Sequence, residues 1–148
     1  MNDTEPEVSV FRLDRPGIRK VLGDLEAEIM EFIWGSPPGE GTTVRDVFEV
    51  LYARRRIAYT TVMSTMARLA KKNLLGVERD DQAYVYYPKL SQEEFISRFV
   101  GHVLEDLMVS FADATFNELG TLSDPQVAAR AQQLLEEIAR RRTVEEGE

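Results

Sequence analysis

Apolar residues recur with helical spacing between Ile57 and Leu75, and this stretch predicts one amphipathic helix. The positions i, i+3, i+4 and i+7 of a buried stripe are occupied by Val62, Thr65, Met66 and Leu69. The opposite side has no acidic residue and presents hydroxyls followed by cations, namely Thr60, Thr61, Ser64, Arg68 and Lys71. A helix that enters the major groove of DNA needs such a layout, with small polar groups near base edges and cations near phosphates. The same pattern is also found on helices whose outer face is simply solvated.

Two shorter amphipathic segments precede this helix. The first runs from Asp24, a candidate N-cap, to Trp34, and its predicted inner face consists of Leu25, Ile29, Phe32 and Ile33. The second starts with a capping box of Thr43 and Asp46, and it presents inward Val44, Val47, Phe48 and Leu51. After it ends near Ala53, the basic link Arg54, Arg55, Arg56 leads into the third helix. The order predicts the tri-helical core of a helix-turn-helix domain.

The pattern changes period after Asn73, an asparagine suited to a left-handed helix end. Between Leu74 and Pro88, apolar alternation, a turn at residues 80–82 and a run of tyrosines predict a two-stranded hairpin. A hairpin that directly follows the third helix is a wing. Arg79 lies near its tip, where it either reaches DNA or is an ordinary surface arginine.

The C-terminal part is predicted to be helical. Ser91 and Glu94 form a capping box that starts the longest expected helix, whose apolar stripe continues without a break to Leu119. A further helix begins at Pro125 and is expected to end near Arg142, before an acidic tail. Because two such helices expose too much apolar surface to bury on each other, we expect self-association rather than folding back on the three-helix core. The candidate dimerisation residues are Phe95, Phe99, Val103, Leu104, Leu107, Met108, Phe111, Leu134, Leu135 and Ile138.

The charge distribution strengthens the expectation of a DNA-binding segment. The chain of 148 residues has a net charge of −8, which by itself disfavours contact with phosphates. Residues 54–90, however, contain eight basic and three acidic residues, while both flanking segments are acidic. A local basic patch matters more for phosphate contact than the total charge does.

The composition also argues against several other classes of protein and of functional site. There is no cysteine for a disulfide or a thiolate metal site, and no apolar run long enough to cross a membrane. The N-terminus lacks the apolar region of a signal peptide, so we expect a cytoplasmic protein. The single histidine, His102, lies within an apolar stripe, cannot form a metal cluster by itself and belongs to no evident nucleophile motif, so we expect neither catalysis nor a cofactor.

Four stretches together resemble the penicillinase-repressor (BlaI/MecI/CopY) family: Leu22–Trp34, Thr43–Leu51, Arg54–Leu75 and the wing Arg79–Pro88. The resemblance implies a mainly α-helical fold, with a winged helix-turn-helix domain of three helices plus a two-stranded β wing and a helical C-terminal dimerisation domain. The expected boundaries are a flexible arm at 1–21, the winged domain at 22–90, the dimerisation domain at 91–142 and an acidic tail at 143–148. The residues expected to bind DNA are Arg54, Arg55, Arg56, Tyr59, Thr60, Thr61, Ser64, Arg68, Lys71, Lys72 and Arg79.

Two departures from the family concern induction. The copper-responsive branch uses a C-terminal cysteine site, which this chain lacks. The β-lactam branch is cleaved at an Asn-Phe bond in the dimerisation helix, and the matching region Val100–Phe111 contains none. The inducing signal therefore stays open.

The resulting hypothesis is a homodimeric repressor that binds a palindromic operator in double-stranded DNA, with the third helix in the major groove. Two alternatives remain. The winged helix could be a protein-interaction module whose basic face meets an acidic partner, or the regulator could bind a small effector lined by Phe95, Phe99, Met108 and Phe111, residues better explained by packing.

Overall fold

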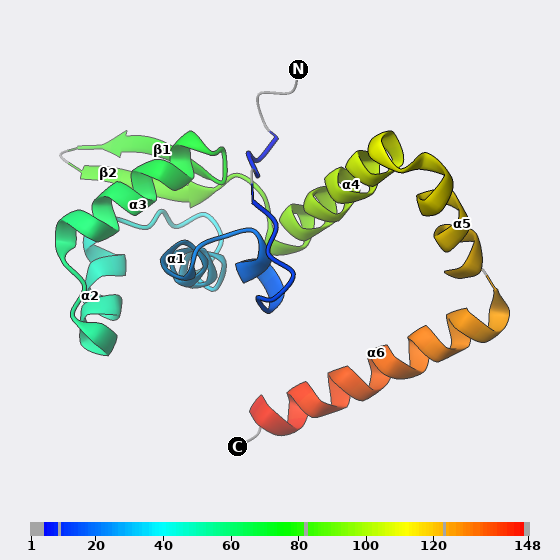
Figure 1. The fold of residues 1–148 in the computed structure, drawn as a ribbon. Coiled ribbons are helices and arrows are strands. Elements are labelled where there is room, and N and C mark those ends of the chain that lie inside the picture. The colour runs from blue at the N-terminus through cyan, green and yellow to red at the C-terminus, as the bar shows by residue number, and fades with distance from the viewer. Residues whose placement is uncertain (1–4, 9, 82, 123, 147–148) are drawn as a thin grey trace. The chain divides into compact units, whose positions relative to one another are not determined.

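The computed structural model describes residues 5–8, 10–81, 83–122 and 124–146 (Figure 1). For residues 122, 131, 134, 135, 138, 139 and 142–146 it describes the backbone alone. The chain divides by its contacts into two units, Met1–Phe99 (unit 1) and Val100–Glu148 (unit 2). Each unit is described by itself.

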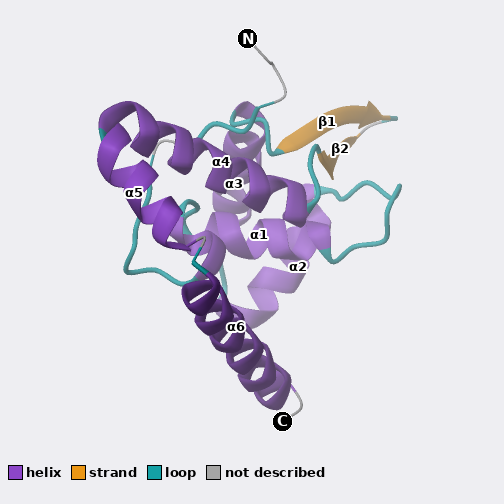
Figure 2. Ribbon diagram, turned by 90° about the vertical axis from the view of Figure 1, so that its right-hand side faces the viewer, coloured by secondary structure: helices purple, strands orange, loops and turns teal. Residues whose placement is uncertain are grey.

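Unit 1 contains the predicted succession of three helices and a hairpin. The helices are α1 (Asp24–Trp34), α2 (Val44–Arg55) and α3 (Tyr59–Lys71), and the strands are β1 (Leu75–Asp80) and β2 (Ala83–Pro88). The strands pair antiparallel, from Leu75 opposite Pro88 to Asp80 opposite Ala83, and form a ribbon beside the helices (Figure 2). The prediction of a mainly helical fold with a winged helix-turn-helix is confirmed.

The core of unit 1 is built from apolar faces of all three helices and the hairpin. The predicted stripe of α3 is buried, and within it the Thr65 hydroxyl donates to the Thr61 carbonyl at 2.7 Å. The face of α1 differs from the prediction: Ala27 and Met30 are fully buried, while Leu25 and Phe32 are only partly so. The core residues are Ile18, Leu22, Ala27, Ile29, Met30, Ile33, Val44, Val47, Leu51, Val62, Met66, Leu69, Leu74, Leu75, Tyr86 and Phe95.

The helix ends follow local polar chemistry. The capping box of Thr43 and Asp46 is present, with both reciprocal bonds near 3 Å. The sequence suggested Asp24 as the N-cap of α1, but the N-cap is Gly23. Its extended backbone directs its N–H to the Glu26 carboxylate at 3.0 Å. Just after the C-terminal end of α3, Asn73 has the expected left-handed backbone, with φ of 66°.

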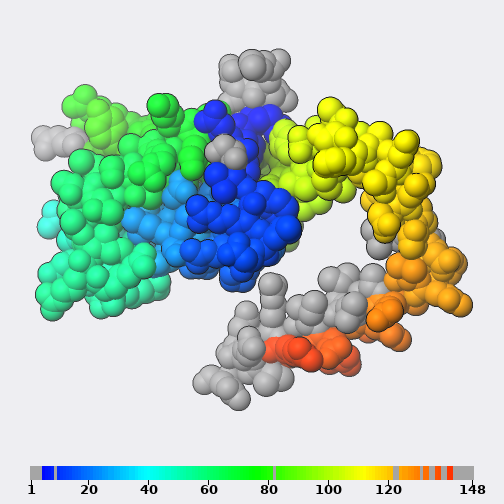
Figure 3. Space-filling model, viewed as in Figure 1, coloured from blue at the N-terminus to red at the C-terminus, as the bar shows by residue number. Residues whose placement is uncertain are grey.

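The segment before α1 contacts the core, although the sequence suggested a loose arm. It contains a short 3-10 helix, η1 (Gly17–Lys20), because Ile18 and Leu22 are apolar and become buried. Further upstream, the N–H of Glu7 donates to the carbonyl of Lys72 at 2.9 Å. The space-filling view shows this segment, in blue, packed against the rest of unit 1 (Figure 3).

The first two turns of α4 (Gln92–Ser110) also belong to unit 1. The capping box of Ser91 and Glu94 starts the helix as predicted. Phe95 is 1% exposed and its ring centroid lies 5.8 Å from that of Trp34. The Phe99 ring packs against that of Phe11 in the arm, tilted by 58° and with the centroids 5.2 Å apart.

The expected long helix is interrupted. Helix α4 ends at Ser110, and α5 (Ala112–Leu122) begins after a bend at Phe111, where the Leu107 carbonyl accepts a bond from the Thr115 hydroxyl at 3.1 Å. The longest helix in the described part of the chain is α6 (Pro125–Glu146), which starts at the predicted proline and continues into the expected tail as far as Glu146. The last two residues of that tail, 147 and 148, lie outside the described residues. None of the described side chains of unit 2 is buried. No helix within the described residues is long and apolar enough to span a membrane.

Candidate nucleic-acid interface

The outer face of α3 is open to solvent along its whole length. Its exposed members include the hydroxyl residues and cations predicted for it, Thr60, Thr61, Ser64, Arg68 and Lys71, and the predicted Tyr59. Two further exposed residues were not predicted, Ala67 and Met63, the latter at 44% exposure. The Ser64 hydroxyl donates to the Thr61 carbonyl at 3.1 Å, which leaves its oxygen lone pairs free to accept. The face therefore offers donors and acceptors on a rigid helix that is anchored by a fully buried stripe.

The cations at the end of α3 fall into two kinds. Arg68 and Lys71 have no carboxylate partner among the described residues, so both are available for an anion. Lys72 differs, because its ammonium lies 2.9 Å from the Glu26 carboxylate, and Glu26 is only 7% exposed. The charge pattern predicted the same role for Lys72 as for Lys71. Because consecutive residues at a helix end point in different directions, Lys72 is instead directed toward Glu26 of α1.

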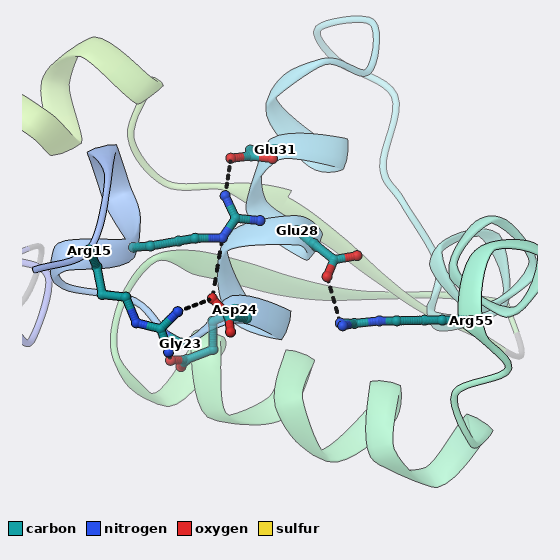
Figure 4. A network of polar contacts seen from close by, with 8 residues as sticks. Arg15, Gly23, Asp24, Glu28, Glu31 and Arg55 are labelled. Carbon is teal, nitrogen blue, oxygen red and sulfur yellow. Dashed lines mark hydrogen bonds and ion pairs between the residues drawn. The ribbon is translucent and has the colours of Figure 1, made fainter.

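The three consecutive arginines before α3 also have different surroundings. Arg54 is exposed at the end of α2. Arg55 forms an ion pair of 2.6 Å with Glu28 of α1, whose side chain is 17% exposed (Figure 4). Arg56 closes α2 in the left-handed conformation, with φ of 50°. One of the three positive charges is thus already neutralised inside unit 1.

An aromatic cluster that the sequence pattern did not predict joins α2 to the start of α3. The ring of Phe48 lies 5.3 Å from that of Tyr52 and 5.4 Å from that of Tyr59, the latter edge to face. The Arg56 guanidinium carbon lies 5.3 Å from the centre of the Tyr52 ring, and Arg56 Nη1 donates to the Tyr52 hydroxyl at 3.1 Å. The spacing of Tyr52 and Arg56, four residues apart, was the available signal.

At the wing, Arg79 is exposed near the hairpin tip and has Tyr84 opposite it in the register. Tyr84 is 59% exposed, so the tip presents a cation next to an aromatic ring. Asp81 adopts the left-handed conformation of a turn, with φ of 51°. Of these residues, the sequence predicted a role in DNA binding for Arg79 alone.

Burial affects one phenol beneath this surface. Desolvation raises the pKa of Tyr86 above its ordinary value, and the neighbouring Tyr59 and Tyr84 add to the effect. The backbone of Tyr86 bonds in both directions to Thr42, at 2.8 Å each. This bridge ties β2 to the segment that precedes α2.

Within the described residues, no group of three or more histidine or acidic side chains is placed to hold a metal ion.

The candidate dimerisation residues are divided by the structure. Phe95 and Phe99 pack within unit 1, so Phe95 is not available to a second molecule. In unit 2, Val103 is half-buried, and the exposed members are Leu104, Leu107, Met108 and Phe111, at 38–62%. The side chains of Leu134, Leu135 and Ile138 lie outside the part that the structure describes.

Comparisons with known proteins agree with the family that the four sequence stretches suggested. A family model described as "Penicillinase repressor" matches residues 22–141. Two curated proteins named "Transcriptional regulator BlaI", from Mycobacterium tuberculosis strains CDC 1551 / Oshkosh and ATCC 25618 / H37Rv, are each 49% identical over 76 residues, 51% of this chain and 54% of theirs. The chain therefore spans about half the length of the curated relatives it matches. The solution structure of the DNA-binding domain of the repressor BlaI aligns with a TM-score of 0.44 and 22% identity, covering 54% of this chain and 93% of that one.

Proposed function

Because this chain belongs to the penicillinase-repressor family, we propose that it is a DNA-binding transcriptional repressor that acts as a homodimer on a palindromic operator. The observation that carries the proposal is the exposed, acid-free face of α3. Arg68 and Lys71 extend from this face without a carboxylate partner among the described residues. No enzymatic reaction is proposed, since both the family and its matched relatives are named for regulation.

The role of each residue follows from its surroundings. Near the N-terminal end of α3, the hydroxyls of Thr60, Thr61 and Ser64 would face base edges in the major groove. Arg68 is long enough to reach either a guanine edge or a phosphate. The phosphate contacts would come from exposed cations around the helix, Arg54, Arg56, Lys71 and Arg79. Arg55 and Lys72 would contribute less, because each is held by a carboxylate of α1.

The exposed apolar side chains of unit 2 support a homodimer. Val109 is 85% exposed and Phe116 is 70% exposed, and such surface is stabilised when a second copy covers it. Two copies would present two α3 helices to successive major grooves, about 34 Å apart or a multiple of that distance. Occupancy of the operator would then exclude RNA polymerase.

The test is selection of genomic fragments by the purified full-length protein at about 0.15 M salt, which suppresses much non-specific phosphate binding. We expect a palindromic sequence to be enriched. On that sequence, Arg68→Ala should cost about 1–3 kcal/mol and relax the preference at one base pair of each half-site. Lys71→Ala should weaken binding to all sequences alike and reduce the log–log salt slope by about one unit for each phosphate that loses its lysine.

Two results would contradict the proposal. The first is a fragment pool no different from the input, together with a salt slope near zero. The second is a protein that remains monomeric at concentrations at which it binds its operator, which would exclude the dimeric mode while retaining DNA binding.

A further inference from the structure

The cluster formed by Phe48, Tyr52, Arg56 and Tyr59 gives one of the three linker arginines a fixed position. We infer that Arg56 is a pre-positioned phosphate-binding residue at the start of the recognition helix, and that Tyr52 is its positioning residue. This inference rests on the proposed function and deepens it. It concerns the sugar–phosphate backbone that flanks the bases read by α3.

The backbone fixes where the Arg56 side chain begins. Arg56 is the C-cap of α2, and its N–H donates to the Tyr52 carbonyl at 3.0 Å. Its left-handed conformation, with φ of 50°, is one that non-glycine residues seldom adopt. The turn therefore directs the side chain back along the last turn of α2 instead of leaving it free on a flexible link.

The side chain is held by two contacts with the same residue. The guanidinium carbon lies 5.3 Å from the Tyr52 ring centre, within the range of a cation–π interaction. In addition, Nη1 donates to the phenol oxygen at 3.1 Å. A guanidinium carries five N–H donors, so several remain for phosphate oxygens.

The ring of Tyr52 is itself supported. Phe48 lies between Tyr52 and Tyr59, so the aromatic contacts run from the Arg56 site to the first residue of α3. Because Tyr59 opens α3, the position of the guanidinium is coupled to the helix that would lie in the groove. Ordering a long side chain before binding reduces the entropy lost when it binds.

The neighbouring arginines provide the contrast that makes this assignment specific. Arg55 is turned toward α1, where Glu28 neutralises it. Arg54 has no such support from a ring or a carboxylate among the described residues. Among the three, Arg56 alone is both open to an anion and held in place.

The experiment measures operator binding by full-length variants over a range of salt concentrations. Arg56→Ala should lower affinity and reduce the log–log salt slope by about one unit for each Arg56 engaged, hence about two in a dimer. Tyr52→Ala keeps every cation, so its slope should stay near the wild-type value. Affinity should fall about twofold to fivefold for each Tyr52–Arg56 pair, the range for one exposed cation–π contact, hence about fivefold to thirtyfold in a dimer. Tyr52→Phe retains the ring and should recover part of that loss.

A double-mutant cycle separates positioning from a general structural effect. If Tyr52 acts through Arg56, then Tyr52→Ala should add almost no further loss in the Arg56→Ala background. Arg130→Ala removes the same charge from an exposed site on α6, outside unit 1, and serves as the control that should leave the slope unchanged. Circular dichroism should show the same helix content in all variants.

The possible failures are distinguishable. An unchanged slope for Arg56→Ala, with a reduced slope for Lys71→Ala, would overturn this inference and leave the proposed function standing. Additive losses for Tyr52 and Arg56 would overturn the positioning role of Tyr52. A wild-type slope near zero would overturn both the inference and the proposed function.

Discussion

Replacement of Phe95 by alanine distinguishes a core role from an interface role. The apolar pattern of α4 assigns Phe95 to the same stripe as Phe111, and the sequence predicts that both contact a second molecule. The structure separates them, with Phe95 at 1% exposure against Trp34 and Phe111 at 62% exposure. The two substitutions should therefore change different measured quantities.

The magnitude follows from burial. Removal of a buried phenylalanine ring costs about 3–5 kcal/mol, because the transfer free energy of the ring is lost and a cavity remains. For a unit of about 100 residues, each kcal/mol shifts Tm by roughly 4–8 °C. Phe95→Ala should thus lower the Tm of the transition that includes unit 1 by at least about 12 °C. Phe111→Ala removes a largely exposed ring and should change the folding of its own chain by no more than about 0.5 kcal/mol.

The assay is thermal unfolding followed by circular dichroism at several protein concentrations, combined with sedimentation of the native proteins. We expect the Phe95→Ala loss to be present at every concentration. Phe111→Ala should instead weaken self-association and change how Tm depends on concentration. If Phe95→Ala kept a Tm within about 2 °C of wild type and dissociated like Phe111→Ala, the placement of Phe95 in the core of unit 1 would be refuted.

Three further changes test contacts inside unit 1. Lys72→Met removes the partner of a nearly buried carboxylate, so urea denaturation should show a loss of about 1–3 kcal/mol; an unchanged midpoint would mean that the pair contributes nothing. Burial raises the pKa of Tyr86 in the folded state, so the folding stability linked to its proton is fully present below the ordinary pKa of 10.0 and is lost as pH rises through the higher folded pKa. Tyr86→Phe should therefore make the alkaline loss of stability less steep, and an equally steep loss would contradict the raised pKa. A Cβ at Gly76 would overlap the far end of the Tyr87 side chain, which is 38% exposed and can turn aside, so Gly76→Ala should destabilise by about 0.5–1.5 kcal/mol in the same denaturation assay. A loss above about 3 kcal/mol would contradict this freedom of the ring. The control Gly120→Ala, with open space around the added methyl group, should be neutral or stabilising by up to about 1 kcal/mol.

Local patterns were sufficient to predict the three helices α1 to α3 and the hairpin of unit 1. The stripe of α3, the capping boxes that start α2 and α4, and the turn of the hairpin each depend on residues within a few positions of one another. Their side chains meet in any chain that adopts the local structure, which is why spacing alone identifies them. The exposed face of α3 was predictable for the same reason, since it is the complement of the buried stripe.

Contacts between distant residues were not predictable in this way. The Lys72–Glu26 pair joins positions 46 apart, and no spacing rule connects them. The break at Phe111 was hidden because apolar residues keep helical spacing on both sides of a single bent residue. A stripe shows that Phe95 needs an apolar partner, but it does not identify Trp34 as that partner. The order of α1, α2, α3 and the wing was thus available from the sequence, whereas the division of α4 between two units required the structure.

The contact of Trp34 with the start of α4 has a practical consequence for spectroscopy. Trp34 is the single tryptophan of the chain, its indole Nε1 donates to the Leu90 carbonyl at 2.9 Å, and its ring lies against Phe95. Detachment of the first turns of α4 would hydrate the indole and shift its fluorescence emission to longer wavelength, while unfolding confined to unit 2 would leave the emission unchanged. The chain therefore contains an intrinsic optical reporter for the junction that precedes its C-terminal helices, and following that junction in the proposed operator-binding assay requires no added label.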